Sequence, residues 1–347
     1  MKDVSELTGE SIALPVSAWE KATHPVVPAI RDAMGSVAFL NQRSPDPVSV
    51  IELQRRVEQA WKLWHSSPQQ RTDVGRLLPE LIIQSHSCVR FAEAEQRRAR
   101  AVAGDLYRLV QRLLAHISEP QLHALAVERG RAMSEGADTP LSLALAAWSS
   151  SVSLCASGEY SDAARLADLG ADLVRPHLES GTVEIRGVYG ALQLEAAAAH
   201  GLAGREGDSY RYLDAASRTA RLLPPGYSHL PSAFDSYNVE ILSVIVSTCL
   251  RKTGSAIRQA SKINIGGVRS VVRRSRVLLE TAQAKADRRD FTEAVVDLEA
   301  AAAVSLEAVA LIPWARTLAD ELAECAPASI ADRSSSLAAR MKAAVLN

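Results

Sequence analysis

The stretch of sequence that decides the fold is Trp148–Pro176, which reads WSSSVSLCASGEYSDAARLADLGADLVRP. Its apolar and small residues recur at spacings of three and four on both sides of Gly158. Such spacing gives each of two helices one apolar face. Gly158 can adopt the positive φ that a tight turn between helices requires, and Tyr160 can fill the gap between the paired helices. The stretch therefore predicts two antiparallel helices joined by a short turn.

Three further copies of this order follow along the chain. The small residues that begin the second helix of each copy are Ala163, Ser209, Ala256 and Ala294, at steps of 46, 47 and 38 residues (163 to 209, 209 to 256 and 256 to 294). In the fourth copy Arg289 occupies the position of the turn glycine. This order of helix, turn and second helix with small residues at its crossing points is typical of the tetratricopeptide motif. The sequence therefore predicts an all-α fold of antiparallel helix pairs, stacked as a tetratricopeptide-like right-handed superhelix.

The pattern divides the chain into four segments. Residues 1–47 contain five prolines, which disfavour long helices, so we expect an N-terminal arm there. Residues 48–136 predict helix pairs without the repeat consensus, and residues 137–326 predict degenerate tetratricopeptide repeats. Residues 327–347 place Leu337, Met341 and Val345 at helical spacing, which predicts a C-terminal capping helix.

Composition and charge argue against several classes of protein. Of the 347 residues, 47% are hydrophobic but only 5% aromatic, and no apolar run reaches the length of a membrane span, so we expect no membrane contact. With 39 Lys and Arg against 40 Asp and Glu, no global charge draws the chain to DNA or to anionic lipid. The four cysteines lie far apart, without a CxxC pair or a preceding secretory leader. They predict small core residues in a reducing cytoplasm.

The sequence contains no recognisable catalytic or metal-binding pattern. It lacks HExxH, a zinc-spaced Cys/His cluster, a phosphate-binding P-loop and a GxSxG elbow. His116 and His123 are the closest histidines, but Pro120 separates them onto different helices, which favours surface or capping roles over metal binding. We therefore predict a protein that is not an enzyme and has no catalytic residue, cofactor or metal.

Two arginine-rich runs invite comparison with nucleic-acid-binding surfaces. They are Arg97, Arg98, Arg100 and Arg108, and Arg269, Arg273, Arg274 and Arg276. Apolar residues alternate with the arginines at helical spacing, and no aromatic residue stands beside them to stack on a base. Both runs therefore predict solvated helix faces. The alternative is a nucleic-acid contact made through phosphate groups alone.

If the repeats bind a partner, inward-facing side chains of each first helix line the concave surface. Alignment of the copies gives Trp148, Asn238, Thr248, Arg276 and Gln283, and we expect Tyr189 to lie near Trp148, which makes six candidate residues. We expect Asn238 and Gln283 to hydrogen-bond a peptide backbone, while Trp148 and Tyr189 receive an apolar side chain. The alternative for Trp148 is simple packing between helices. The Lys and Asn set with which chaperone-type repeats clamp a C-terminal carboxylate is absent from the matching positions.

Short runs before the repeats carry a more specific resemblance. These runs are WKLWHSSP at Trp61–Pro68, RTDVG at Arg71–Gly75, LLPEL at Leu77–Leu81 and LYRLVQRLLAH at Leu106–His116. Together with the repeat around Trp148, they resemble the C-terminal sensor region of bacterial XRE-type helix-turn-helix transcriptional regulators that carry tetratricopeptide domains. The resemblance extends over residues 48–325 and implies a non-enzymatic role in transcriptional control.

In that family a complete DNA-binding domain precedes the sensor, and the arm of residues 1–47 is too short for one. Within the arm, Val16–Pro25 and Ala29–Gly35 resemble the end of a recognition helix and the helix after it, so the arm reads as a remnant of a helix-turn-helix domain. Without the first helix and a half, no apolar core could hold those residues in a major groove. The resemblance therefore implies DNA contact only indirectly, or through a domain that this chain lacks.

Three hypotheses of function follow. The first is a regulatory module that binds a protein, a peptide or a small signalling ligand. The second is a structural scaffold without a ligand, a homodimer that mediates protein–protein interactions. The third is a direct DNA-binding regulator that uses residues 1–35, where Lys2, Lys21 and Arg31 are the only lysines and arginines.

Overall fold

The computed structural model describes residues 24–36, 48–115, 117 and 119–346. The regular secondary structure in these ranges is helical apart from one isolated bridge, which confirms the predicted all-α class. The rest of the predicted arm, residues 1–23 and 37–47, lies outside the described residues, as does His116. Among the described helices, none combines the length and the apolar character that crossing a membrane requires.

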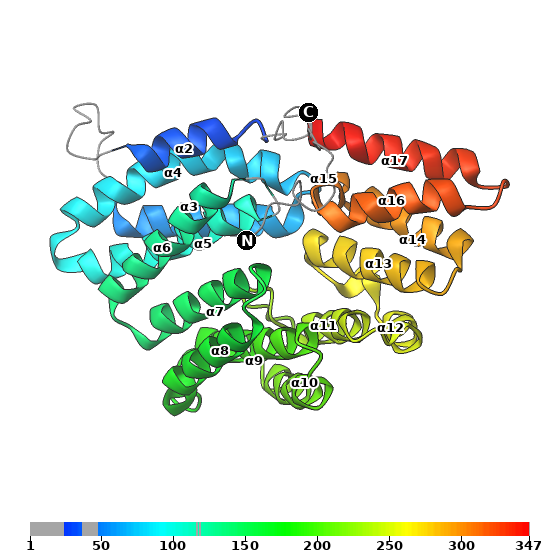
Figure 1. Cartoon of the computed structure of the whole chain (residues 1–347). Coiled ribbons are helices and arrows are strands. Elements are labelled where there is room, and N and C mark those ends of the chain that lie inside the picture. The colour runs from blue at the N-terminus through cyan, green and yellow to red at the C-terminus, as the bar shows by residue number, and fades with distance from the viewer. Residues whose placement is uncertain (1–23, 37–47, 116, 118, 347) are drawn as a thin grey trace, which may run out of the picture.

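The helices form three groups along the chain (Figure 1). The N-terminal group contains α2 (Val27–Gly35), α3 (Val50–Ser66), α4 (Gln70–Phe91), α5 (Gln96–Leu114) and α6 (Pro120–Ala137). The four predicted repeat copies contain α7 (Pro140–Ala156) and α8 (Tyr160–Val174), α9 (Val183–Leu202) and α10 (Glu206–Arg221), α11 (Ser236–Cys249) and α12 (Thr253–Ala260), and α13 (Val271–Ala286) and α14 (Phe291–Val304). The C-terminal group contains α15 (Leu306–Ala310), α16 (Pro313–Cys325) and α17 (Ala331–Leu346). Short 3-10 helices are η2 (Glu93–Glu95), η3 (Arg175–His177) and η4 (Ile265–Gly267).

The four repeat pairs turn through the same backbone motif. The turn residues Gly158, Gly204, Arg251 and Arg289 have positive φ values of 85°, 72°, 59° and 65°. The residue after each one donates its N–H to the carbonyl five positions earlier, at 2.8–3.0 Å. Positive φ together with this bond is the Schellman arrangement, which satisfies the last carbonyls of a helix. The same steps of 46, 47 and 38 residues therefore separate four equivalent turns (158 to 204, 204 to 251 and 251 to 289).

The small residues predicted to begin the second helices lie where helices cross. Ala163, Ser209, Ala256 and Ala294 have no exposed surface. In the first two pairs the crossing is also bonded, because Ser151 Oγ donates to the Ala163 carbonyl at 2.8 Å and Ser209 Oγ to the Ala197 carbonyl at 2.6 Å. Larger side chains here would push the helix axes apart, so these positions set the spacing of the array.

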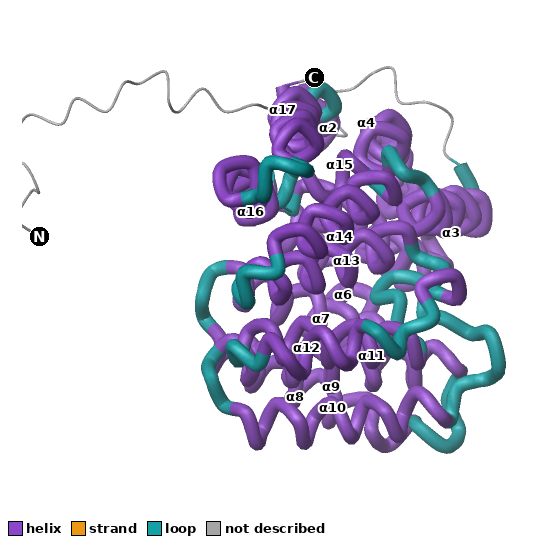
Figure 2. The backbone as a smooth tube through the Cα atoms, turned by 90° about the vertical axis from the view of Figure 1, so that its right-hand side faces the viewer, coloured by secondary structure: helices purple, strands orange, loops and turns teal. Residues whose placement is uncertain are grey.

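The helices follow one another around an arch whose two ends meet (Figure 1). Besides the packing of consecutive helices, α3 packs against α13 and α4 against α15. At this join, the Glu307 carboxylate of α15 accepts hydrogen bonds from the backbone N–H groups of Arg71 and Thr72, at 2.8 and 3.0 Å. Both groups belong to the first turn of α4 and have no partner within that helix, so α15 caps α4. Figure 2 shows the stack from the side, with α2, α4 and α17 at one end and α10 at the other.

His65 of α3 adds a second connection across the join. Its Nε2 lies 2.8 Å from the Leu230 carbonyl, and its Nδ1 lies 2.9 Å from the Ser270 hydroxyl just before α13. Because a carbonyl only accepts, Nε2 carries the proton and Nδ1 accepts from the hydroxyl. Burial lowers the pKa of His65 to about 4, so the ring is neutral at physiological pH.

Three sequence interpretations were wrong in detail. Arg108 does not lie on a solvated face: it is 2% exposed, pairs with Asp105 and donates to Ser134 Oγ at 2.9 Å. Cys325 is exposed rather than a core residue. In the second arginine run, Arg273 and Arg276 face the interior of the arch and are only partly exposed.

The segment predicted as a C-terminal capping helix forms α17, which packs on α16.

The segment that resembles a remnant of a DNA-binding domain belongs to the helical array. Residues 29–35 lie in α2, which packs on α4. Val27, Ile30 and Met34 of α2 have no exposed surface. A Cβ atom on Gly75 of α4 would lie 2.7 Å from the Val26 side chain, so glycine permits this close approach. The apolar face of α2 is therefore used for packing inside this chain.

Candidate functional site

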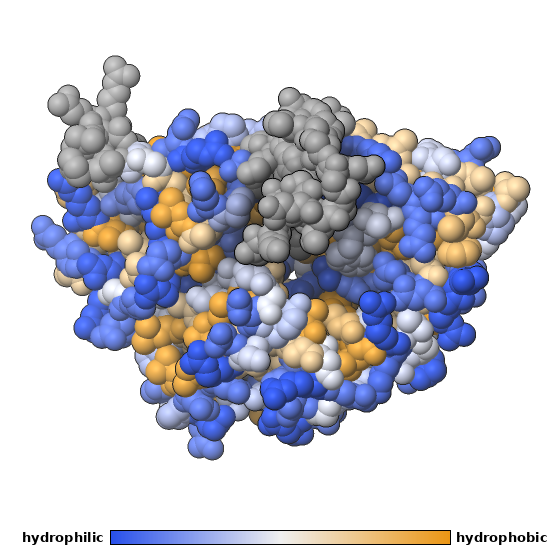
Figure 3. All heavy atoms as spheres, in the orientation of Figure 1, coloured by the Kyte–Doolittle hydropathy of each residue, from blue (hydrophilic) through white to orange (hydrophobic). Residues whose placement is uncertain are grey.

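Two adjoining cavities inside the arch, of about 100 and 80 Å³, share Arg112 and Arg273 in their walls. Together they are termed the inner hollow. The first cavity is also lined by Arg71 and Arg276, and the second by Trp148, Glu195 and Asn238. Figure 3 shows hydrophilic and hydrophobic residues interspersed over this face of the molecule. The hollow thus lies between the N-terminal group and the first helices of the repeats.

The structure brings three of the six predicted site residues into the inner hollow. These are Trp148 of α7, Asn238 of α11 and Arg276 of α13. The other three use their polar groups elsewhere: Tyr189 contacts Arg175, Thr248 donates to the Val244 carbonyl of its own helix at 3.1 Å, and Gln283 donates to Asp287 at 2.7 Å. Trp148 is 4% exposed and belongs to a hydrophobic core cluster, so it packs between helices, as the alternative interpretation expected. A ligand-binding role for these residues stays a prediction.

Arg112 lies in the last turn of α5 with its guanidinium over the Trp148 ring, 6.0 Å from the centroid. The adjacent residues hold α5 against α7: the Gln111 amide donates to the Ser149 carbonyl at 2.8 Å, and the Ser149 hydroxyl donates back to Gln111. Within the described part of the chain, Arg112 forms a cation–π contact but no hydrogen bond or salt bridge. Burial lowers the pKa of its guanidinium, with Glu195 opposing this shift.

Arg273 and Arg276 reach the hollow from α13. Arg273 stands in the first turn, where the positive end of the helix dipole disfavours a cation. It donates to the Ser232 carbonyl at 3.1 Å. Burial lowers its pKa to about 10, and the positive charges of Arg112 and Arg276 add to the lowering. Arg276 itself is neutralised, because it forms a salt bridge with Glu280 at 2.6 Å.

Glu195 of α9 provides the carboxylate in the hollow. Burial raises its pKa, and this effect outweighs a hydrogen bond from Cys155 and the attraction of Arg112 and Arg273. Its ionised form is therefore less favourable than that of a carboxylate in water. At full ionisation it carries one negative charge against the guanidinium groups of Arg112 and Arg273. Arg71, which donates to the Leu113 and Ala115 carbonyls, adds a third positive charge to the first cavity. The inner hollow consequently has an excess of positive charge in a poorly hydrated place.

Asn238 adds an unpaired hydrogen-bond acceptor to the same hollow. Its side chain is 6% exposed, and its amide nitrogen donates to the Ser232 carbonyl at 3.4 Å. Its Oδ1 is buried and, among the described residues, accepts no hydrogen bond. An unpaired buried acceptor costs about 1–3 kcal/mol, so an N–H or O–H donor in the hollow would be favourable.

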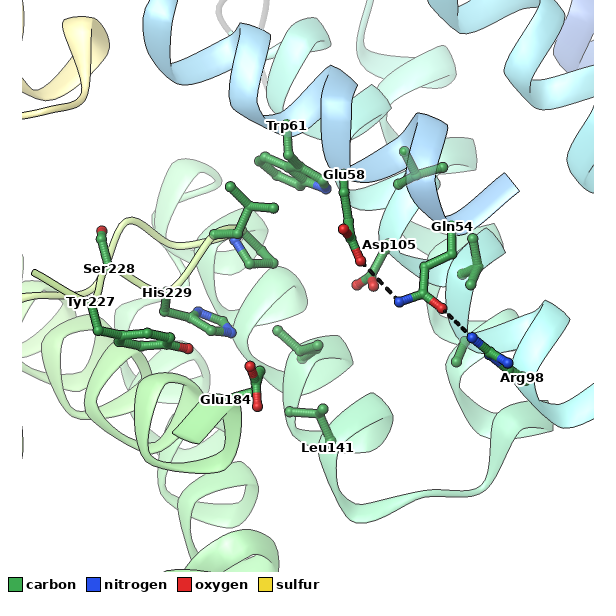
Figure 4. Close-up of a pocket in the computed structure, with 16 residues that line it drawn as sticks. Gln54, Glu58, Trp61, Arg98, Asp105, Leu141, Glu184, Tyr227, Ser228 and His229 are labelled. Carbon is green, nitrogen blue, oxygen red and sulfur yellow. Dashed lines mark hydrogen bonds between the residues drawn. The ribbon is translucent and has the colours of Figure 1, made fainter. Parts of the chain in front are cut away.

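A larger pocket, termed the side pocket, opens between α3, α5 and residues 227–231 of the loop before α11 (Figure 4). Its volume is about 470 Å³, within the range typical of small-molecule sites. Its apolar walls are Val57, Val102, Leu141, Leu145, Leu230 and Pro231. Its polar groups lie on two opposite sides: Gln54, Glu58, Arg98 and Asp105 on one, and Glu184, Tyr227 and His229 on the other.

Two glycines of α9 seat the loop that closes the side pocket. A Cβ atom on Gly187 would lie 2.8 Å from His229, and one on Gly190 would lie 2.0 Å from the ring of Phe234. Both loop side chains are buried, at 2% and 0% exposure. The His229 Nδ1 lies 2.7 Å from the Ser232 hydroxyl, and burial lowers the pKa of His229 to about 3, which keeps the ring neutral.

The sequence pattern did not reveal that Arg112 and Arg273 line both cavities of the inner hollow. Arg273 precedes Arg276 by three positions, which places both on one helix face, so the inward prediction for Arg276 was an available signal for Arg273. Arg112 belongs to α5, outside the repeats, and nothing local marks it as inward-facing. Glu195 and its neighbour Leu194 line the same cavity, and neither was among the six predicted residues.

Within the described residues, no group of three or more His, Cys, Asp or Glu side chains is placed to hold a metal ion. Comparison with known protein families, with curated proteins and with solved structures found no match to this chain. The function must therefore be argued from the geometry of the inner hollow and the side pocket.

Proposed function

We propose that this chain is a non-enzymatic regulatory module of the tetratricopeptide type, related to the sensor region of XRE-type regulators, and that it binds an anionic ligand in the inner hollow. The observation that carries the proposal is the pair Arg112 and Arg273. Both guanidinium groups lie deep in the arch, and neither forms a salt bridge with a described residue. Burying a cation without a partner is costly, and an anion bound between the two arginines would offset that cost.

The rest of the hollow limits the chemistry of the ligand. A carboxylate or phosphate matches the two guanidinium groups, which bind such oxygens through paired hydrogen bonds. The free Oδ1 of Asn238 calls for an N–H or O–H donor on the same ligand. Cavities of about 100 and 80 Å³ admit an anionic group with a short chain rather than a large molecule. A carboxylate side chain of an acidic peptide, together with a backbone N–H beside it, has these features, and so does a small hydroxylated or aminated acid.

The four equivalent Schellman turns, each followed five positions later by a small residue with no exposed surface, support the tetratricopeptide assignment. Arrays of this kind bind ligands on the side where the first helices lie. Ligand binding between α5, α7, α9, α11 and α13 would change how these helices pack. That change would be passed to a protein partner or to a DNA-binding domain.

A thermal-shift titration tests the proposal. The ligands are inorganic phosphate and a capped acidic pentapeptide of Glu and Asp, and the matched neutral peptide contains Gln and Asn instead. We expect the acidic peptide, the phosphate or both to raise the melting temperature, and the neutral peptide to leave it unchanged. Arg112→Gln and Arg273→Gln should each weaken the effect about tenfold or more, since hydrogen bonds to charged groups contribute about 1.5–3 kcal/mol.

The matched control is Arg340→Gln, which removes an exposed arginine on α17, far along the chain from the hollow. Stabilisation by the peptide but not by phosphate identifies a peptide ligand, and the reverse identifies a small anion. No stabilisation by either, or equal weakening in Arg340→Gln, would contradict the proposal and favour a scaffold without a ligand.

A further inference from the structure

We propose that the side pocket is a second binding site, which takes a molecule with an apolar body, a protonated amine and a hydrogen-bond acceptor next to that amine. The proposal comes from the juxtaposition of Trp61 and Glu58, which stand one turn apart on α3 at the wall of the pocket. Trp61 offers a hydrogen-bond donor there, and Glu58 offers a negative charge. The N-terminal residue of a peptide and a small amino-carbonyl compound both carry the matching groups.

The donor is the indole N–H of Trp61. The side chain is 1% exposed, and its Nε1 is buried with no hydrogen-bond partner among the described residues. An indole N–H can only donate, so a carbonyl or hydroxyl oxygen must satisfy it. Figure 4 shows the Trp61 ring at the pocket with its nitrogen on the side of Glu58. A buried unpaired donor of this kind indicates a place where a ligand oxygen would be stabilised.

The negative charge is the carboxylate of Glu58. One of its oxygens accepts from the Gln54 amide at 2.9 Å, and Gln54 in turn accepts from Arg98 at 2.9 Å (Figure 4). In the described part of the chain, Glu58 forms no salt bridge. The Gln54 amide thus fixes the carboxylate without neutralising it. An ammonium group at this position would gain a charge-assisted hydrogen bond.

The remaining walls agree with this choice of ligand. Glu184 also lines the pocket and, in the described part of the chain, forms no salt bridge. Asp105 is paired with Arg108 and Arg98 with Glu95, so the carboxylates of Glu58 and Glu184 give the pocket a field that favours a cation. His229 is neutral because its pKa is lowered to about 3, and it adds no opposing charge. The apolar walls and the volume of about 470 Å³ leave room for an aromatic or branched side chain beyond the polar groups.

The side pocket and the inner hollow share no lining residue. They also differ in the sign of their charge. This inference therefore does not depend on the proposed anion site, and each can fail alone.

Isothermal titration at about pH 6.5, where an α-amino group is protonated, tests the inference. The probe is phenylalaninamide, which has an ammonium, a carbonyl and an apolar ring, and the control ligand is N-acetylphenylalaninamide, which lacks the ammonium. We expect saturable binding of the first and at least about tenfold weaker binding of the second. Octylamine, which has no acceptor, should also bind more weakly than phenylalaninamide. A tripeptide amide that begins with Phe distinguishes the sources, since tighter binding than phenylalaninamide identifies a peptide N-terminus and weaker binding identifies a small molecule.

Two variants assign the contacts. Glu58→Gln should weaken binding of phenylalaninamide about tenfold or more, and Trp61→Phe about three- to tenfold, because the second loses a neutral hydrogen bond. Glu321→Gln, an exposed glutamate of α16, is the matched control and should bind as the unmodified chain does. If Trp61→Phe unfolds, Glu58→Gln and the acetylated ligand still decide the question. Absence of saturable binding, equal binding of the acetylated ligand, or unchanged affinity in Glu58→Gln would overturn the inference.

Discussion

Replacing Glu307 with alanine opens the join between the two ends of the arch. The carboxylate accepts from the N–H groups of Arg71 and Thr72, from the Thr72 hydroxyl at 2.6 Å and from His24 Nε2 at 3.3 Å. Loss of a helix N-cap costs about 0.5–2 kcal/mol, and loss of a hydrogen bond to a charged group costs about 1.5–3 kcal/mol. Water reaches part of the site, since the Glu307 side chain is 13% exposed. We therefore expect Glu307→Ala to lower the free energy of unfolding by about 2–4 kcal/mol.

The same contacts give this contribution a pH dependence. Burial alone would raise the pKa of Glu307, but hydrogen bonds from His24 and Thr72 and the N–H groups of α4 outweigh it and lower the pKa below its ordinary value of 4.5. A carboxylate whose folded pKa is lowered stabilises the protein above its unfolded pKa. The contribution is therefore complete above about pH 5 and is lost as the pH falls through the folded pKa.

Urea unfolding followed by circular dichroism and tryptophan fluorescence measures both effects. The join also couples α3 and α4 to α13 and α15. Its loss should therefore broaden the transition or lower the m-value, as expected for an array held only by neighbour contacts. Glu321→Ala, an exposed change on α16, should shift stability by no more than about 0.5 kcal/mol. A Glu307→Ala shift no larger than that of the control, or an unchanged pH dependence between pH 3 and 6, would refute the role of the join.

Three further predictions concern the turns, the loop and the second connection of the join. Arg251→Gly and Arg289→Gly should each stabilise the chain by about 0.5–1 kcal/mol in urea unfolding, because glycine adopts positive φ without strain; destabilisation would contradict the turn assignment. Gly190→Ala should lower the free energy of unfolding by about 1–3 kcal/mol and displace the loop of residues 222–235, because the added Cβ would collide with the Phe234 ring. Faster amide hydrogen exchange in this loop would show the displacement, and unchanged exchange would contradict the close approach of Phe234. Since the pKa of His65 is lowered to about 4, the free energy of unfolding should fall as the pH drops from about 6.5 towards 4. His65→Ala should show a weaker dependence of this free energy on pH. An equal pH dependence in the variant would mean that other groups cause it.

The repeat units were predictable because their signals are local. A turn, a small residue and helical apolar spacing all fall within one short stretch, and the structure buries the small residues at the four predicted positions. The third turn residue, Arg251, was not identified from the sequence. Arg289 could be read as a turn residue despite its side chain, because the copies fixed its position. The closure of the arch was not predictable in this way. Glu307 caps a helix more than 230 positions earlier in the chain, and neither end of that contact has a local signature.

The candidate site was predictable only in part, for a related reason. Inward positions on the first helices follow from repeat alignment, which is how Trp148, Asn238 and Arg276 were identified. Whether an arginine on such a face meets a carboxylate depends on helices from other parts of the chain. Glu280 forms a salt bridge with Arg276, whereas among the described residues Arg273 forms no salt bridge and donates to the Ser232 carbonyl. Helical spacing predicted a solvated face for both, because spacing alone carries no information about what packs opposite.

The most direct test of the central claim is a crystal structure of the chain grown with the capped acidic pentapeptide. The account predicts a carboxylate of the peptide within hydrogen-bond distance of both Arg112 and Arg273, with a peptide N–H directed at the free Oδ1 of Asn238. A peptide bound elsewhere, or an inner hollow in which Glu195 pairs with both arginines and leaves no room for an anion, would contradict it.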